Sequence, residues 1–282
     1  MRATLTTWRD PRLRWALGLA LLLHGALLTA GSYRGSYDSW VHIFFGDHYA
    51  RDWFSTWEPR WYTGFTVTSY PPASHQAIGL FSRLIGLEAA FVVLQIAAVL
   101  NIVVGVYRFS MLWVSREAAG WAALLAVVSS SLAEVVHTFG QLPTTFALGF
   151  LLNAQPSIRR WVHQGVRVDL VAAIALLAAT TAGHHVTTLF GTVFFTGPVV
   201  VRAVLDRWGT PIDNEPVGHL LRFRFAMLRP QVARRLRRVL PATMRAGVLG
   251  VIIVATLITV VLPYWLWSSS DPITQVPIPH AS

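Results

Sequence analysis

Long apolar stretches without charged residues alternate with short arginine-rich segments along the chain. A helix needs about 20 mostly apolar residues to cross a membrane core of about 30 Å. Arginines or aromatic residues at the ends of such stretches are typical of membrane-spanning helices. Three stretches with this pattern are residues 13–31, 89–107 and 246–267. The pattern therefore predicts an all-α integral membrane protein.

Two further apolar stretches in the middle of the chain predict a helical hairpin. Residues 118–133 and 135–158 are separated by Glu134, and Gly140 and Pro143 mark a turn nearby. Both stretches are close to spanning length, so we expect them to cross the membrane in opposite directions.

The uncharged stretch 170–201 is too long for one ordinary helix. A single crossing would also place the basic segments on its two sides on opposite faces of the membrane, against the usual bias of positive charge. Two short helices that turn at Gly183-His184-His185 keep both segments on one face. The chain is then expected to have about seven spans.

The charges orient these spans. All 23 basic residues are arginines, and most fall in segments that this arrangement places on one face, whereas acidic residues outnumber arginines on the other. Because cytoplasmic loops carry the excess of arginine, the N-terminus is expected in the cytoplasm and the C-terminus outside, in a multi-pass protein of the cell membrane. We expect a transmembrane module at residues 1–268 and an outer proline-rich tail at residues 269–282. Within the module we expect an outer loop at residues 32–88 and a cytoplasmic basic loop at residues 202–245.

The first apolar stretch has a second interpretation as a cleaved signal peptide. Arg12 and Arg14 lie at its N-terminal end, and small residues end it near Ala30. The many spans that follow favour an uncleaved first helix instead.

Composition supports the membrane class and bears on partners. Hydrophobic residues make up 54% of the 282 residues, charged residues 13%, and the mean hydropathy is +0.50. The net charge of +10 would suit nucleic-acid binding, but a soluble DNA-binding protein does not usually interleave arginines with apolar stretches of spanning length. We therefore expect no nucleic-acid partner. The basic segment 217–240 is instead expected on the inner leaflet, where each arginine contributes about 1 kcal/mol against anionic lipid.

The segment between the first two spans combines aromatic and ionisable residues and holds the candidate chemistry. Residues 38–54 predict a helix along the membrane surface, and residues 77–87 predict a second, short one. At 100° per residue, one face of the first helix carries two carboxylates, an imidazole and two aromatic rings: Asp38, His42, Phe45, Tyr49 and Asp52. Asp47 and Arg51 lie on other faces.

A carboxylate and an imidazole one helical turn apart, here Asp38 and His42, favour either of two kinds of site. They could act as a base with its orienting partner, or they could hold a divalent cation such as Mg or Mn, with Asp47 and His48 as further ligands. The alternative is an interfacial anchor whose charges face water. The absence of cysteine excludes thiolate metal ligands and disulfides.

The sequence resembles the membrane proteins named as related to 6-pyruvoyl-tetrahydropterin synthase, whose architecture is similar to that of the GT-C lipid-dependent glycosyltransferases. The likeness covers the first half of the chain well and the second half thinly. The residues that carry it are Asp38, His42, Trp57, Pro59, Gly64, Tyr70-Pro71-Pro72 and His184.

The resemblance implies a GT-C-like fold with two surface helices before a block of spans. It implies that Asp38 is the catalytic base and that the donor is a polyprenyl-phosphate sugar delivered through the bilayer. The usual acidic pair is altered here, because the next carboxylate, Asp47, is nine residues on and faces another side of the helix. Family members are longer, so a partner chain or a continuation is expected to supply a missing C-terminal portion.

The reaction that the resemblance implies assigns further residues. Asp38 would take the proton of an acceptor hydroxyl, assisted by His42, while the lipid phosphate departs. Positive and polar groups would bind substrate and phosphate, namely Arg51, Arg60, Tyr70, His184 and His185. His184 and His185 can equally be two imidazoles at a water-exposed turn. The alternative functions are a flippase-like carrier, a scaffold for a partner chain, or a fragment that is inactive alone.

Overall fold

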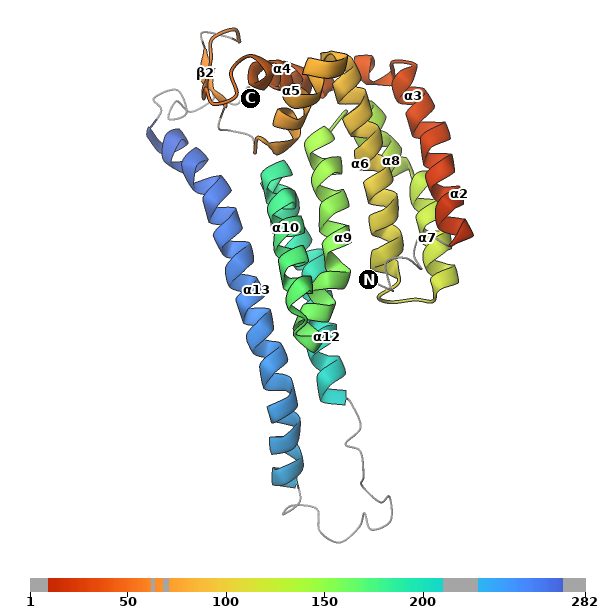
Figure 1. The fold of residues 1–282 in the computed structure, drawn as a ribbon, viewed down its shortest axis with the longest axis vertical. Helices are drawn as coiled ribbons and strands as arrows, with labels where there is room; N and C mark the ends of the chain where they lie inside the picture. The colour runs from red at the N-terminus through yellow and green to blue at the C-terminus, as the bar shows by residue number, and fades with distance from the viewer. Residues whose placement is uncertain (1–9, 62–63, 68–70, 210–227, 271–282) are drawn as a thin grey trace, which may run out of the picture.

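The computed structural model describes residues 10–61, 64–67, 71–209 and 228–270, and this part of the chain is almost entirely helical (Figure 1). A layer of surface helices covers one end of a bundle of longer helices. The all-α class predicted from the apolar pattern is therefore confirmed.

The N-terminal helical column consists of α2 (Pro11–Ala20), the π-helical turn η1 (Leu21–Gly25) and α3 (Ala26–Thr29). Asp10 begins it as N-cap, since its Oδ1 accepts a hydrogen bond from the backbone N of Arg12 at 3.0 Å. Gly31 ends it with a φ of +94°, which favours glycine. The column occupies the stretch predicted as the first span.

The surface layer consists of α4 (Ser39–Arg51), an antiparallel pair of short strands, and α5 (Ala73–Ile85). The strands β1 (Trp57–Glu58) and β2 (Phe65–Thr66) pair Trp57 with Thr66 and Glu58 with Phe65. Helices at both predicted positions are confirmed, with shifted ends. They pack closely through small residues: a Cβ on Gly46 would lie 2.4 Å from Cγ2 of Ile78.

The bundle is built from longer helices. Its members are α6 (Leu87–Ser110), α7 (Arg116–Val127), α8 (Ser130–Ala133) with the π-helical η4 (Glu134–Thr138), α9 (Leu142–Gln164), α10 (Arg167–Gly183), α11 (His185–Gly191) with η5 (Thr192–Thr196) and α12 (Gly197–Gly209), and α13 (Leu228–Ser270). Among the described residues, three segments are long and apolar enough to cross a membrane: Leu87–Ser110, His185–Gly209 and Arg234–Pro263. The pair Arg116–Val127 and Ser130–Thr138, bent by 47°, makes a fourth if it is one span.

The helix α9 holds the bundle together. Its first half joins a core with α2, α6 and α7, and its second half joins a core with α10, α12 and α13. Small residues let α6 approach it, since a Cβ on Gly105 would lie 2.7 Å from that of Leu152. Asn153 of α9 donates through Nδ2 to the Asn101 carbonyl of α6 at 3.0 Å. The two apolar cores therefore meet along one helix.

The boundaries of the predicted hairpin need one correction. The turn at Gly140 is confirmed, with a φ of +66°, but Glu134 does not separate the two helices. It begins the π-helical turn η4, and the bend lies earlier, between α7 and α8. The predicted turn at Gly183-His184-His185 is confirmed, because α10 ends at Gly183 and α11 begins at His185.

The segment predicted as a basic loop, residues 202–245, is helical at both ends. Residues up to Gly209 continue α12, and α13 begins at Leu228; residues 210–227 lie outside the described part. Pro230 does not break the segment, because it occupies the first turn of α13, where the backbone N–H has no partner within the helix. At 1.5 Å per residue the 43 residues of α13 span about 64 Å, roughly twice the thickness of a membrane core. Its N-terminal part accordingly extends beyond the ends of α6 and α9 (Figure 1).

Candidate functional site

Asp38 immediately precedes α4, at the end of the bundle covered by the surface layer. Its backbone N donates to the Phe139 carbonyl at 2.9 Å, and its carbonyl accepts from the backbone N of His42 at 3.0 Å. These bonds tie the start of α4 to the turn before α9. The carboxylate is half-buried and does not cap the helix, and it has no hydrogen bond or ion pair with any residue of the described part.

His42 is buried and bonds to a histidine instead of to Asp38. Its Nδ1 lies 3.0 Å from Nε2 of His75 on α5, and the two ring centroids are 5.1 Å apart. Burial, together with a smaller effect of the nearby His184, lowers the pKa of His42 to about 3. Burial also lowers the pKa of His75, and His42 adds to this effect. Both imidazoles are therefore neutral near pH 7, so the predicted Asp38–His42 pair is replaced by a neutral His42–His75 pair.

The surface layer meets the turn between α10 and α11 at this histidine pair. His184 adopts an extended backbone there, and its Nδ1 lies 2.7 Å from Oγ1 of Thr187. The ring of His185 is 6.1 Å from that of His184. The close approach of His184 to His42 joins two segments that sequence analysis treated separately. Both histidines of the turn are half-buried, which differs from the water-exposed turn considered above.

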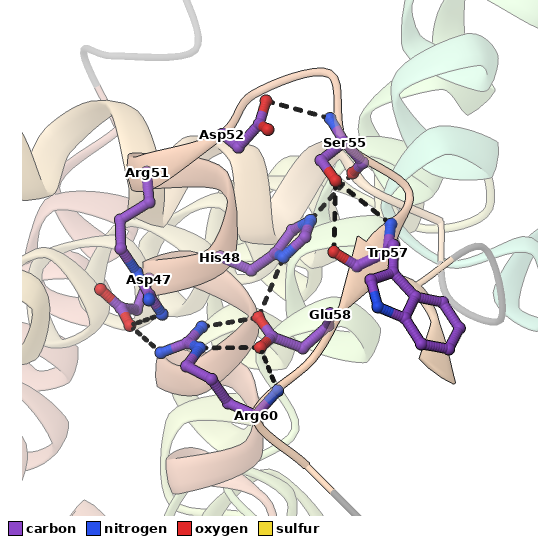
Figure 2. A network of polar contacts seen from close by, with 8 residues as sticks. All are labelled: Asp47, His48, Arg51, Asp52, Ser55, Trp57, Glu58 and Arg60. Carbon is purple, nitrogen blue, oxygen red and sulfur yellow. Dashed lines mark hydrogen bonds and ion pairs between the residues drawn. The ribbon is translucent and has the colours of Figure 1, made fainter. Parts of the chain in front are cut away.

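A second cluster of polar side chains fixes the β-hairpin to α4 (Figure 2). Arg60 donates from Nε and Nη2 to the two carboxylate oxygens of Glu58, at 2.7 and 2.6 Å, and from Nη1 to Asp47 at 2.6 Å. Arg51 also donates to Asp47, at 2.6 Å. His48 lies between Glu58, 3.0 Å from Nδ1, and the Ser55 carbonyl, to which its Nε2 donates at 2.9 Å.

This network changes the roles predicted for its members. Arg51 and Arg60, predicted to bind phosphate, face carboxylates; Asp47 and His48, predicted as metal ligands, face arginines and a buried glutamate. The predicted metal set of Asp38, His42, Asp47 and His48 is therefore not assembled. Within the described ranges, no group of three or more histidines and carboxylates has the geometry to hold a metal ion. The predicted Tyr70 lies outside the described residues.

Two residues of this region were missed by the sequence analysis. Glu58 is 1% exposed and is the central acceptor of the network, and His75 is buried against His42. The helical spacing on α4 gave no signal for either, because both come from other elements. Of the residues predicted to share one face of this helix, His42, Phe45 and Tyr49 are buried, Asp38 is half-buried, and Asp52, which follows α4, is exposed.

A groove opens between the first helical column and the junction of α5 with α6. Its volume is about 640 Å³. Apolar side chains line part of it, and Tyr33, Arg34 and Glu88 line the rest. The Tyr33 hydroxyl donates to Glu88, and Arg34 donates to the same carboxylate at 3.2 Å. The groove is therefore apolar over part of its wall and polar at the level of the surface layer.

The sequence matches no family model, no curated protein and no solved structure at a significant level. The resemblance to the membrane proteins named for 6-pyruvoyl-tetrahydropterin synthase therefore stays a prediction.

Proposed function

We propose that this chain is a GT-C-like membrane glycosyltransferase that moves a sugar from a polyprenyl-phosphate donor to an acceptor at the outer face of the cell membrane. The proposal includes about seven spans, a cytoplasmic N-terminus and an outer surface layer. The positive charge of the segments at the opposite end from this layer supports that orientation.

The observation that carries the proposal is the state of the Asp38 carboxylate. Asp47 and Glu58, in the same outer segment, are held by arginines, and Asp52 accepts from the backbone N of Ser55 at 3.2 Å. Among the described residues of the loop, Asp38 is the half-buried carboxylate whose oxygens are not held by these contacts and can accept a proton from a substrate. A general base needs an oxygen that can reach a substrate proton, which Asp38 offers and its ion-paired neighbours do not.

In the proposed reaction Asp38 accepts the proton of the acceptor hydroxyl. The acceptor oxygen forms a bond to the anomeric carbon, the bond from that carbon to the phosphate oxygen breaks, and polyprenyl phosphate leaves. The groove beside Tyr33 and Arg34 suits an amphiphilic donor, because an apolar wall continues into polar side chains. His184 and His185 are proposed to contact the substrate from the turn above α10.

The test is a comparison of cell-envelope glycans and accumulated lipid-linked sugars between a deletion strain and strains that carry single variants. Asp38→Asn should reproduce the deletion, with donor accumulating, while the protein still inserts into the membrane. Asp52→Asn is the matched control in the same loop and should leave transfer unchanged. Retained transfer in Asp38→Asn would remove Asp38 from the mechanism.

A non-catalytic role as a scaffold for a partner chain is the second candidate, because one specific observation favours it. The apolar window of Arg234–Pro263 is only 11% buried, against 50% for Leu87–Ser110. Such a face suits lipid or a neighbouring transmembrane helix. If deletion changes neither glycans nor lipid-linked sugars, and the chain co-purifies with a second membrane protein, the scaffold role replaces the transferase.

A further inference from the structure

A chain of hydrogen bonds connects Ser32 to the interior of the bundle through two histidines. The Ser32 hydroxyl lies 2.8 Å from Nδ1 of His137, Nε2 of His137 lies 2.9 Å from Nδ1 of His24, and Nε2 of His24 lies 2.8 Å from the Val127 carbonyl. The two imidazoles are stacked, with centroids 5.1 Å apart and planes within 6°. The predicted candidate sites include none of these residues.

The Val127 carbonyl at the buried end of this series of hydrogen bonds determines which atom donates in each bond. A carbonyl only accepts, so Nε2 of His24 carries a proton and, in the neutral ring, Nδ1 is an acceptor. His137 must then donate from Nε2, which leaves its Nδ1 lone pair facing the Ser32 hydroxyl. The neutral network therefore has one arrangement of protons, in which Ser32 donates to a histidine whose tautomer is held by the next residue. A nucleophilic serine requires the same relationship between nucleophile, base and orienting group.

The local backbone presents both histidines in an unusual way. His24 lies in the π-helical turn η1, and His137 lies in the π-helical turn η4. Single π-helical turns are rare and occur frequently at functional sites. His24 is 1% exposed, whereas Ser32 and His137 are half-buried. The base is therefore held from the interior, and Ser32 directly precedes Tyr33, which lines the groove.

We propose that Ser32 is an activated nucleophile that reacts with carboxylic esters of amphiphilic molecules at the membrane surface. The inference shares the membrane placement of the proposed function but does not depend on sugar transfer. The ester class follows from the chemistry of a serine paired with a neutral imidazole. The amphiphilic class follows from the adjoining groove, which is apolar in part and polar at the surface layer.

The Ser32 oxygen forms a bond to the ester carbonyl carbon while its proton moves to Nδ1 of His137. The bond from that carbon to the alcohol oxygen then breaks, and the leaving alcohol takes the proton from His137. The product is an acyl-serine, which water or a second alcohol cleaves by the same steps in reverse. The excess positive charge is shared with His24, whose imidazolium is stabilised by the Val127 carbonyl.

A fluorophosphonate probe tests the proposal on the full chain in detergent micelles. Ser32 would attack phosphorus, the phosphorus–fluorine bond would break, and fluoride would leave. Intact-mass and peptide analysis should place the adduct on Ser32, and Ser32→Ala should abolish it. The matched control is Ser36→Ala, which removes a buried hydroxyl of the same turn that donates to the Tyr33 carbonyl at 2.7 Å; it should leave labelling unchanged.

The histidines are tested by the rate of labelling. His137→Ala removes the base and should slow labelling roughly 100-fold, the lower end of general-base effects. His24→Asn removes the orienting imidazole and should slow labelling while shifting its pH profile, which a purely structural role would not do. Thermal unfolding of each variant checks the fold. If a histidine variant does not fold, the site of labelling in the wild-type protein tests the proposal. Labelling on Ser32 supports it. The absence of that label, or equal labelling of other serines, overturns it.

Discussion

Arg60 donates two hydrogen bonds to the Glu58 carboxylate, from Nε at 2.7 Å and from Nη2 at 2.6 Å, and only Pro59 separates the two residues in the sequence. The same guanidinium reaches Asp47 on α4 and lies 4.7 Å from the ring centroid of Phe44. Arg60 therefore fastens the β-hairpin to α4, and its role in this structure is to hold these two elements together.

The variant Glu58→Gln should destabilise the protein. Glu58 is 1% exposed and contacts both Arg60 and His48, so the neutral amide leaves Arg60 without its counter-charge and removes a carboxylate oxygen beside His48. Removing one partner of a buried ion pair costs about 3–5 kcal/mol, and the partial exposure of Arg60 argues for about 3 kcal/mol here. Denaturation in mixed micelles measures the free energy of unfolding. The exposed Asp52→Asn serves as control and should stay within about 0.5 kcal/mol of wild type.

Acid should destabilise the protein through the His42–His75 pair. The pKa of His42 is about 3 in the folded protein and about 6.5 in an unfolded chain. Between these values the unfolded chain binds more protons, so stability is complete above about pH 6.5 and is lost as the pH falls toward 3. The slope is at most about 1.4 kcal/mol per pH unit for each histidine.

The melting temperature in micelles, followed from pH 7 to pH 4, checks this dependence. Replacing both His42 and His75 by leucine should flatten the profile over that interval. A wild-type profile that is already flat would mean that the two imidazoles are not buried as neutral groups.

Single cysteines test the orientation, because the chain has none of its own. Tyr37, beside the surface layer, is 81% exposed, and Arg235 is exposed on α13. A membrane-impermeant maleimide added to intact cells should label Tyr37→Cys, and it should label Arg235→Cys only after permeabilisation. The reverse pattern would invert the topology and remove the proposed reaction from the outer face.

The sequence alone determined the helical elements and much of their order. Apolar stretches of spanning length led to α6 and α13, and the glycine and histidines at 183–185 led to a turn. The helical spacing of His42, Phe45 and Tyr49 led to a shared face of α4, and the structure shows that these three residues are buried. These properties depend on residues a few positions apart, because burial of an apolar stripe is set by the periodicity of the helix itself. Length and composition alone do not establish all seven predicted spans.

The tertiary structure decided which polar groups meet. His42 bonds to His75 from another helix, Arg60 of the β-hairpin donates to Asp47 of α4, and Ser32 reaches His24 through His137, more than 100 residues away. Such pairings depend on how helices pack side by side, and a residue's own neighbours in the chain contain no record of that distance. The π-helical turns that contain His24 and His137 lie in different helical segments, so the sequence around either histidine does not indicate that the two rings stack.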